Sequence, residues 1–196
     1  SGNTQFDASG LQNSSTYEVL AQVTKSSPTA RAKTMATTNI TRTWPTDAES
    51  DGTGVQFISL DKADIYDVES IKLNDSDGNS MAFNFTVDNG QRDNYYGIGR
   101  LVKKQGISIP TGTQIYSKFK YFEHNTTGDF FDITSYPTAD VPYHKIPNHT
   151  LSDGTEVSLR DVIDFRPRAN KAHNSADNTV NIAFDSNGQG GAAIIN

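Results

Sequence analysis

The chain has no cysteine among its 196 residues, and it contains one tryptophan and two methionines. The absence of cysteine excludes a disulfide framework and thiol chemistry, and it fits a protein made in a reducing cytosol. No apolar run approaches the length of a membrane span. No basic run is present that would neutralise phosphates, and the formal net charge is -6. We therefore expect neither a membrane nor a nucleic acid among its partners.

Apolar residues are also scarce, with a hydrophobic share of 34% and a mean hydropathy of -0.59. The first residues show neither the basic start nor the apolar stretch of a signal peptide. Ten phenylalanines and eight tyrosines nevertheless argue against wholesale disorder, because disordered chains lack the aromatics needed to bury area. This balance predicts a β-rich protein with a thin aromatic core and long polar turns.

Alternating apolar and polar residues, separated by turn clusters, predict a succession of short strands. Little in the sequence asks for a helix, apart from a possible short helical turn within 59–71. An Asp77-Gly78 pair predicts a hairpin turn between strands at 70–73 and 81–87. The other predicted strands lie at 17–23, 33–44, 55–60, 98–102, 114–122 and 157–165.

These strands predict an all-β fold, an antiparallel β-sandwich of the immunoglobulin or fibronectin-III type, over residues 17–168. Residues 1–16 are polar and unpatterned, so we expect an arm or linker there. Residues 169–196 lose the strand pattern almost throughout, and we expect an extended C-terminal arm.

The segment 88–101, "DNGQRDNYYGIGRL", is rich in residues that tie down backbone rather than in bases or nucleophiles. A second such segment, "DVIDFRPR", alternates acids and arginines around a phenylalanine. We predict that the two form a structural corner, with an Arg92–Asp164 or Asp93–Arg166 ion pair between them. The corner residues are Asp88, Asn89, Gly90, Arg92, Asp93, Tyr95, Tyr96, Asp164, Arg166 and Arg168.

No constellation for catalysis or metal binding stands out. The stretch "NDSDGN" resembles the front of a calcium loop but lacks its distal Glu, so a turn is favoured. The four histidines do not follow zinc-site spacings, and no G-x-S-x-G nucleophile elbow is present. We expect no catalytic residue, no metal and no cofactor.

Four stretches occur in a fixed order: "VQFISLDKADIYDVESI", "VDNGQRDNYYGIGRL", "FKYFEHNTTGDFFDITSY" and "LSDGTEVSLRDVIDFRPR". Together they resemble a family of uncharacterised domains in structural proteins of tailed bacteriophages, of the tail-fibre or baseplate type. The resemblance runs from about Val55 to Arg168. It implies a non-enzymatic virion protein that is made in the bacterial cytoplasm and assembles with other tail proteins and with copies of itself, a trimer being one arrangement.

Two alternatives remain at this point. One is a receptor- or glycan-binding module at the host-facing end of a fibre, where exposed aromatics would contact a host surface glycan or protein. The other is a depolymerase. The residues that we nominate for a ligand platform are Tyr121, Phe130, Phe131, Tyr136 and Tyr143.

Overall fold

The computed structural model describes residues 26–168 and 194–195. The predicted strand at 17–23, the predicted arm at 1–16 and all but two residues of the predicted arm at 169–196 lie outside the described residues. None of the described helices is long and apolar enough to cross a membrane. The strands are β1 (Lys33–Trp44), β2 (Ala48–Ser50), β3 (Gln56–Ala63), β4 (Ile65–Leu73), β5 (Phe85–Asp88), β6 (Ile98–Lys103), β7 (Thr113–His124), β8 (Asn148–Thr150), β9 (Glu156–Ser158), β10 (Ile163–Asp164) and β11 (Ile194–Ile195).

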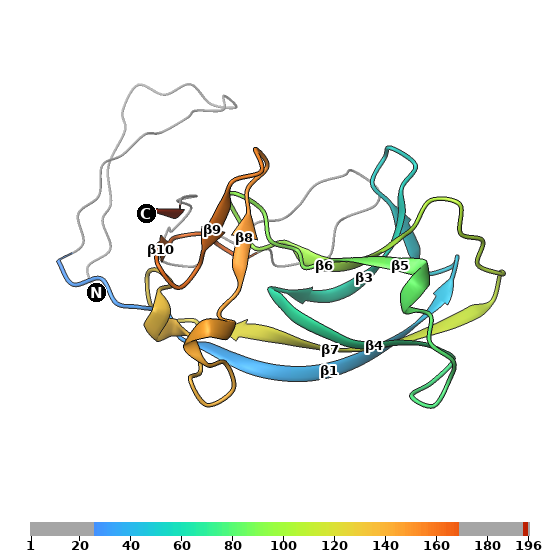
Figure 1. Ribbon diagram of the computed structural model, residues 1–196, viewed down its shortest axis with the longest axis horizontal. Helices are drawn as coiled ribbons and strands as arrows, with labels where there is room; N and C mark the ends of the chain where they lie inside the picture. Colours follow the sequence, from blue (N-terminus) through green and yellow to red (C-terminus); the bar gives the residue numbers. More distant parts are fainter. Residues whose placement is uncertain (1–25, 169–193, 196) are drawn as a thin grey trace, which may run out of the picture.

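Two antiparallel sheets face each other, which confirms the predicted sandwich (Figure 1). One sheet has the order β1-β7-β4, and the other has the order β2-β3-β6-β5. The division into three and four strands is that of constant-type immunoglobulin domains, whereas the order within the sheets differs from theirs. The long strands β1 and β7 pair over their whole length, from Lys33 opposite His124 to Trp44 opposite Thr113.

The alternation in β7 gives the clearest link from sequence to packing. Ile115, Phe119 and Tyr121 point into the sandwich and are buried, while Lys118 on the opposite face is exposed. Phe122 lies on the same face as Lys118 but is also buried, because it packs against a second core beyond the end of the sandwich.

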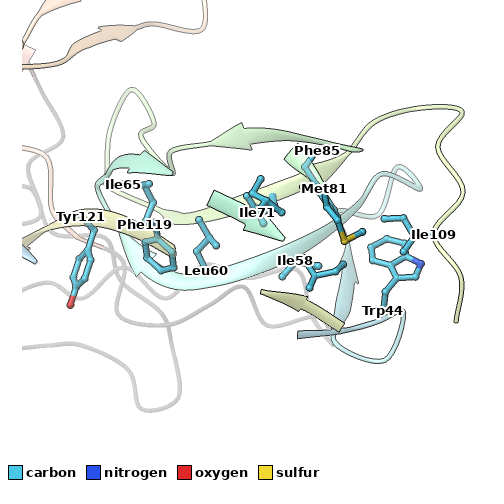
Figure 2. Packing of buried hydrophobic residues seen from close by; sticks show 12 residues of the cluster. Trp44, Ile58, Leu60, Ile65, Ile71, Met81, Phe85, Ile109, Phe119 and Tyr121 are labelled. Atoms are coloured by element: carbon cyan, nitrogen blue, oxygen red, sulfur yellow. The ribbon is translucent and has the colours of Figure 1, made fainter. Parts of the chain in front are cut away.

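The main core fills the space between the two sheets (Figure 2). Trp44, Ile109 and Met81 gather at one end, and Phe119 and Tyr121 lie toward the other. Each fully buried side chain of this size stabilises the fold by roughly 1.5–3 kcal/mol relative to an exposed one. The strand predicted at 55–60 corresponds to β3, which is buried on both faces, since four consecutive residues from Phe57 to Leu60 are buried.

The segment 59–71, in which the sequence allowed a short helical turn, forms most of β3 and β4 instead. The chain leaves the four-stranded sheet at the end of β3 and enters the three-stranded sheet at the start of β4, with only Asp64 between them. Asp64 adopts a φ of 54°, and Asp61 a φ of 56°. Aspartate tolerates this left-handed region better than most residues, so it permits a one-residue corner between layers.

The predicted turn at Asp77-Gly78 is present, but the two predicted strands on either side of it pair only next to the turn. Leu73 and Asn79 are joined by a backbone hydrogen bond of 2.9 Å, and Lys72 forms a single bridge with Ser80. The chain then crosses to the other sheet, so that β4 and β5 are not paired. Gly78 is required here because a Cβ would lie 1.6 Å from the carbonyl oxygen of Leu73.

The strand predicted over 81–87 begins only at Phe85. Residues Ala82–Asn84 form a short 3-10 helix instead, and Phe83 is 75% exposed. Phe85 is buried in the main core, whereas Val87 is largely exposed. Of the three alternating apolar residues Phe83, Phe85 and Val87, only Phe85 is therefore buried.

Residues 125–168 pack beside one end of the sandwich, where β8, β9 and β10 lie in Figure 1. Two further 3-10 helices, Ile133–Ser135 and Tyr143–Lys145, lie in this region, and β10 pairs with β11. Asp132 caps the first of these helices by accepting a hydrogen bond of 2.8 Å from the Thr134 amide. The region has its own core, formed by Phe122, Tyr136, Val141, Ile146, Leu159 and Val162.

Candidate functional site: a buried polar junction

A group of polar side chains is buried where the sandwich meets the C-terminal region. We call it the junction cluster. It draws on the start of β1, the β3–β4 corner, the β5–β6 loop, the end of β7 and the segment around β10. Its members are Lys33, Asp64, Gln91, Tyr96, His124, Tyr136, Asp164 and Arg166.

Asp64 is the centre of the first half of the cluster. Its Oδ2 accepts hydrogen bonds from Lys33 Nζ at 2.7 Å and His124 Nε2 at 2.8 Å, and its Oδ1 accepts one from Gln91 Nε2 at 3.3 Å. Burial opposes ionisation of this carboxyl, but Lys33 and His124 outweigh it and hold the pKa of Asp64 well below its usual range. Asp64 is therefore a carboxylate in the folded protein.

Lys33 lies in an aromatic cage. Its Nζ is 4.5 Å from the ring centroid of Tyr96, 4.6 Å from that of Phe131, 4.7 Å from that of Tyr136 and 5.3 Å from that of Phe122. The same nitrogen donates to the hydroxyls of Tyr96 at 3.1 Å and Tyr136 at 3.3 Å. Burial opposes the charge, yet the Asp64 carboxylate raises the pKa of Lys33 above its usual value. The cage and the carboxylate together stabilise a cation that water does not reach.

His124 is neutral at physiological pH. Burial lowers the pKa of His124 to about 4, against the attraction of Asp64. Because Asp64 is a carboxylate, the His124 nitrogen that faces it must carry the proton, which leaves Nδ1 bare. That Nδ1 is buried and has no hydrogen-bond partner. The ring packs instead against Tyr96 and Phe131, with centroid distances of 4.9 and 4.6 Å.

The second half of the cluster is built on Asp164 and Arg166. The Arg166 guanidinium donates to both carboxylate oxygens of Asp164, at 3.0 and 2.8 Å, and lies over the Tyr96 ring at 4.3 Å from its centroid. Burial opposes the charge, but Tyr96 and Asp164 raise the pKa of Arg166 further. Tyr96 donates its hydroxyl to Asp164. Burial and the Asp164 carboxylate raise the pKa of Tyr96 well above its usual value, so the phenol keeps its proton.

Gln91 joins the two halves. Its amide nitrogen donates to Asp64, and its amide oxygen accepts a hydrogen bond of 3.2 Å from Arg166. The cluster thus contains two cations and two carboxylates, each paired and hydrogen-bonded. A balanced buried network of this kind fixes the relative positions of the segments that contribute to it, and removing one of its four charged members leaves an uncompensated charge.

The two segments predicted to form a corner do meet, although not through the predicted ion pairs. Arg92 pairs with Asp88, at 2.7 Å, instead of Asp164. Arg166 pairs with its own neighbour Asp164 instead of Asp93, and reaches the other segment by donating to the Arg92 carbonyl at 2.9 Å. The geometry favours these partners because both acids lie close in sequence to their arginines, so little chain has to be ordered to bring them together.

The remaining corner residues serve local roles. Asp93 accepts from the Ser152 amide and hydroxyl, which ties the corner to the turn after β8. The Asn89 carbonyl accepts from the Ile65 amide at 3.2 Å, and Gly90 turns the chain with a φ of 83°. Tyr95 is half-buried, and its backbone carbonyl accepts from the Arg92 amide at 2.9 Å. Arg168 is exposed, and its backbone forms a parallel β-bridge with that of Tyr96.

The nominated aromatic residues do not form a common surface. Tyr121, Phe131 and Tyr136 are buried, and each belongs to a core or to the Lys33 cage. Phe130 is partly buried against Phe165, with a centroid distance of 5.9 Å. Tyr143 alone of the five is exposed, at 53%, beneath the Arg160 guanidinium.

Sequence reasoning missed Lys33, Asp64, Gln91 and His124. Lys33 and His124 face each other across the β1–β7 ladder. They are far apart in sequence, so their contact can be foreseen only when the register of the two strands is known. A lysine at the start of a Thr-rich strand carries no local signal of burial.

No group of three or more potential metal ligands occurs among the described residues. A polar pair outside the cluster, His149 and Asp93, has a nitrogen-to-oxygen distance of 3.5 Å. An open pocket of about 320 Å³ lies between the edge strands β4 and β5, lined by Val68, Glu69, Ser70, Ile71, Lys72, Ser80, Ala82, Phe85 and Val87.

Comparison with protein-family models, with curated proteins and with solved structures gives no match. The function has to be argued from the chain itself.

Proposed function

We propose that this chain is a structural module of a phage virion tail, in a tail fibre or the baseplate, and that it acts by assembly and docking rather than catalysis. The resemblance of its ordered motifs to tailed-phage structural domains supports the proposal. So does the part that those motifs play in the fold, since the segments 88–101 and 164–168 supply four of the eight members of the junction cluster.

One observation supports the proposal most: the four charged side chains of the junction cluster are closed to solvent and paired with one another. The side chains of Lys33 and Asp64 are 0% and 1% exposed, and those of Arg166 and Asp164 are 0% and 2% exposed. An enzyme exposes its reactive groups to substrate. Groups that face only one another hold segments in place, which is the requirement of a part that transmits load.

The proposed partners are other tail proteins and further copies of this chain, and the proposed location is the virion. Immunogold labelling of virions from a phage that encodes the chain tests both. We expect label on the tail, at the fibres or the baseplate. Label that is confined to infected-cell lysate, with none on purified virions, would contradict the proposal.

A second measurement separates the docking role from the alternatives. Purified chain is incubated with host cells and with host capsule polysaccharide before phage is added. Under our proposal neither adsorption of the phage nor the length of the polysaccharide changes. Competition for adsorption would instead support a receptor-binding module, and released oligosaccharide would support a depolymerase.

A further inference from the structure

Lys33 and Asp64 form the most deeply buried lysine–carboxylate contact in the described chain. Nζ lies 2.7 Å from Oδ2, and the two side chains are 0% and 1% exposed. The carboxyl carbon is one covalent bond beyond Oδ2, so the amine is held against a potential acyl group. Lys118 and Glu69 are also in contact, at 2.9 Å, but these side chains are 47% and 26% exposed. The two pairs differ in access to water rather than in distance.

We propose that Lys33 and Asp64 become joined by an amide bond between Nζ and Cγ, which forms spontaneously within the folded chain. The fold holds the two groups in contact, which replaces a bimolecular encounter by a unimolecular step. The aromatic cage excludes the water that would solvate the ions and hydrolyse the product. Condensation also removes two buried charges at once, and such charges are costly to keep in an apolar site.

The reaction balances without any additional reagent. The ammonium proton of Lys33 first passes to Oδ2 of Asp64, which gives a neutral amine and a carboxylic acid. The nitrogen lone pair then attacks Cγ and forms a tetrahedral carbon with negative charge on Oδ1. One proton moves from nitrogen to Oδ2, the bond from Cγ to Oδ2 breaks, and Oδ2 leaves as water. An ammonium and a carboxylate are consumed, and one amide and one water are formed.

The neighbouring groups are placed to assist each of these changes. Gln91 Nε2 donates to Oδ1, the atom on which negative charge develops. His124 Nε2 donates a hydrogen bond to Oδ2, the oxygen that leaves. The Tyr96 hydroxyl accepts a hydrogen bond of 3.1 Å from Nζ and so helps to hold the nitrogen in place.

The resting contact is an ion pair, because the pKa of Lys33 is raised and that of Asp64 is lowered. The neutral pair from which condensation starts is thus a minor state, and the reaction is slow. It needs to occur only once in each molecule. Since water is excluded from the product, the amide accumulates.

The bond would tie the start of β1 to the corner between the two sheets, 31 residues further along the chain. This inference goes beyond the proposed function and does not depend on it, because the bond is a property of the isolated chain. A covalent tie at this point would prevent β1 from separating from the corner under load.

The test is the intact mass of the purified wild-type chain, measured under denaturing conditions. We expect a mass lower than that of the sequence by one water molecule. A mass equal to that of the sequence would overturn the proposal, and this outcome does not depend on whether any variant folds.

Digestion with trypsin then locates the bond. Acylated Lys33 is not cleaved, so residues 32–42 should appear joined to residues 63–72 as one branched peptide. Lys118 is the internal control: it contacts Glu69, which lies in the same 63–72 peptide, yet cleavage after Lys118 should be normal. Residues 63–72 recovered only as a free peptide would overturn the proposal.

Loss of water at an Asp-Gly pair such as Asp77-Gly78, through a succinimide, is the competing explanation for the mass. The variant Lys33→Arg keeps a cation opposite Asp64 but cannot form the amide. Its mass should equal that of its own sequence. A loss of water that persists in Lys33→Arg would assign the change to another site and overturn the proposal.

Discussion

The Tyr96 hydroxyl donates a hydrogen bond to the Asp164 carboxylate across 68 residues of sequence, and both side chains are buried. The same oxygen accepts from Lys33 Nζ at 3.1 Å and from the Arg166 guanidinium at 3.2 Å. One phenol thus contacts both cations and one of the two carboxylates of the junction cluster. The hydroxyl thus links the start of β1 to the segment around β10.

Replacing Tyr96 by Phe tests this role, because the ring is kept while the hydroxyl is lost. Asp164 then loses a donor, and two buried cations lose an acceptor. We expect the free energy of unfolding to fall by about 1–3 kcal/mol, the usual cost of leaving buried polar groups unsatisfied. Urea unfolding measures the change. The matched control is Tyr143→Phe, whose exposed hydroxyl meets Asp161 at 3.2 Å and should matter by less than about 0.5 kcal/mol. Equal losses in the two variants would contradict the role of Tyr96.

The two arginines of the corner should differ strongly in their contribution. Arg166→Met leaves Asp164 without its guanidinium in a site closed to water, and we expect a loss of about 3–5 kcal/mol. Arg92→Ala breaks a pair with Asp88 whose side chains are 30% and 22% exposed, and we expect a loss of about 0–1 kcal/mol. Melting temperatures of the two variants, measured side by side, give the order. A larger loss for Arg92→Ala would restore the view that Arg92 holds the corner.

The elements that could be predicted from sequence were those whose pattern is local. The alternation of Ile115, Phe119 and Tyr121 reports one face of one strand, and this face is the one that is buried. The β-branched run of β1 likewise indicated a strand without any knowledge of its partner.

What could not be predicted depends on how elements are placed relative to one another. Between β3 and β4 the sequence has no Gly or Pro, and the change of sheet occurs at Asp64 through a positive φ that sequence does not announce. Lys33 and His124 become neighbours only through the β1–β7 register. The two corner segments do meet, but their ion pairs are not the predicted ones. Which arginine meets which acid is decided by distances of a few ångströms.

His124 should make the stability of the protein depend on pH in a definite window. Its pKa is about 4 in the folded chain and has the ordinary value of about 6.5 in the unfolded chain. Between these values the unfolded chain binds a proton that the folded chain does not. The contribution of His124 to the free energy of unfolding is therefore fully present above about pH 6.5. It is lost as the pH falls toward 4, by roughly 3 kcal/mol in total. Burial, the main cause of the lowered pKa, persists whether Asp64 is free or joined to Lys33.

Urea unfolding at a series of pH values measures this dependence, and the variant His124→Gln should flatten it while keeping a donor toward Asp64. His149→Gln is the control for the other histidine whose pKa is lowered, mainly by burial, and should flatten the profile less. Asp88 has a lowered pKa, so its contribution is lost only as the pH falls below about 4. A profile that is unchanged in His124→Gln would show that this ring is protonated, or accessible, in the folded protein.

Gly90 should not tolerate a side chain, because a Cβ there would clash with a neighbouring backbone atom as well as strain the backbone. A Cβ at this position would lie 2.2 Å from the carbonyl oxygen of Gly97, which is held there because the Gly97 amide donates to the Gly90 carbonyl at 2.6 Å. Gly54 has a similar φ, 90° against 83°, but a Cβ there would meet nothing within 4 Å. Gly54→Ala therefore measures the cost of the left-handed backbone alone, about 1–2 kcal/mol. Gly90→Ala should cost roughly 1–3 kcal/mol more, because the two strands of the corner must also move apart. Urea midpoints of the two variants give the difference. Equal midpoints would contradict the prediction, because they would mean that a Cβ at position 90 is accommodated beside Gly97 at no cost.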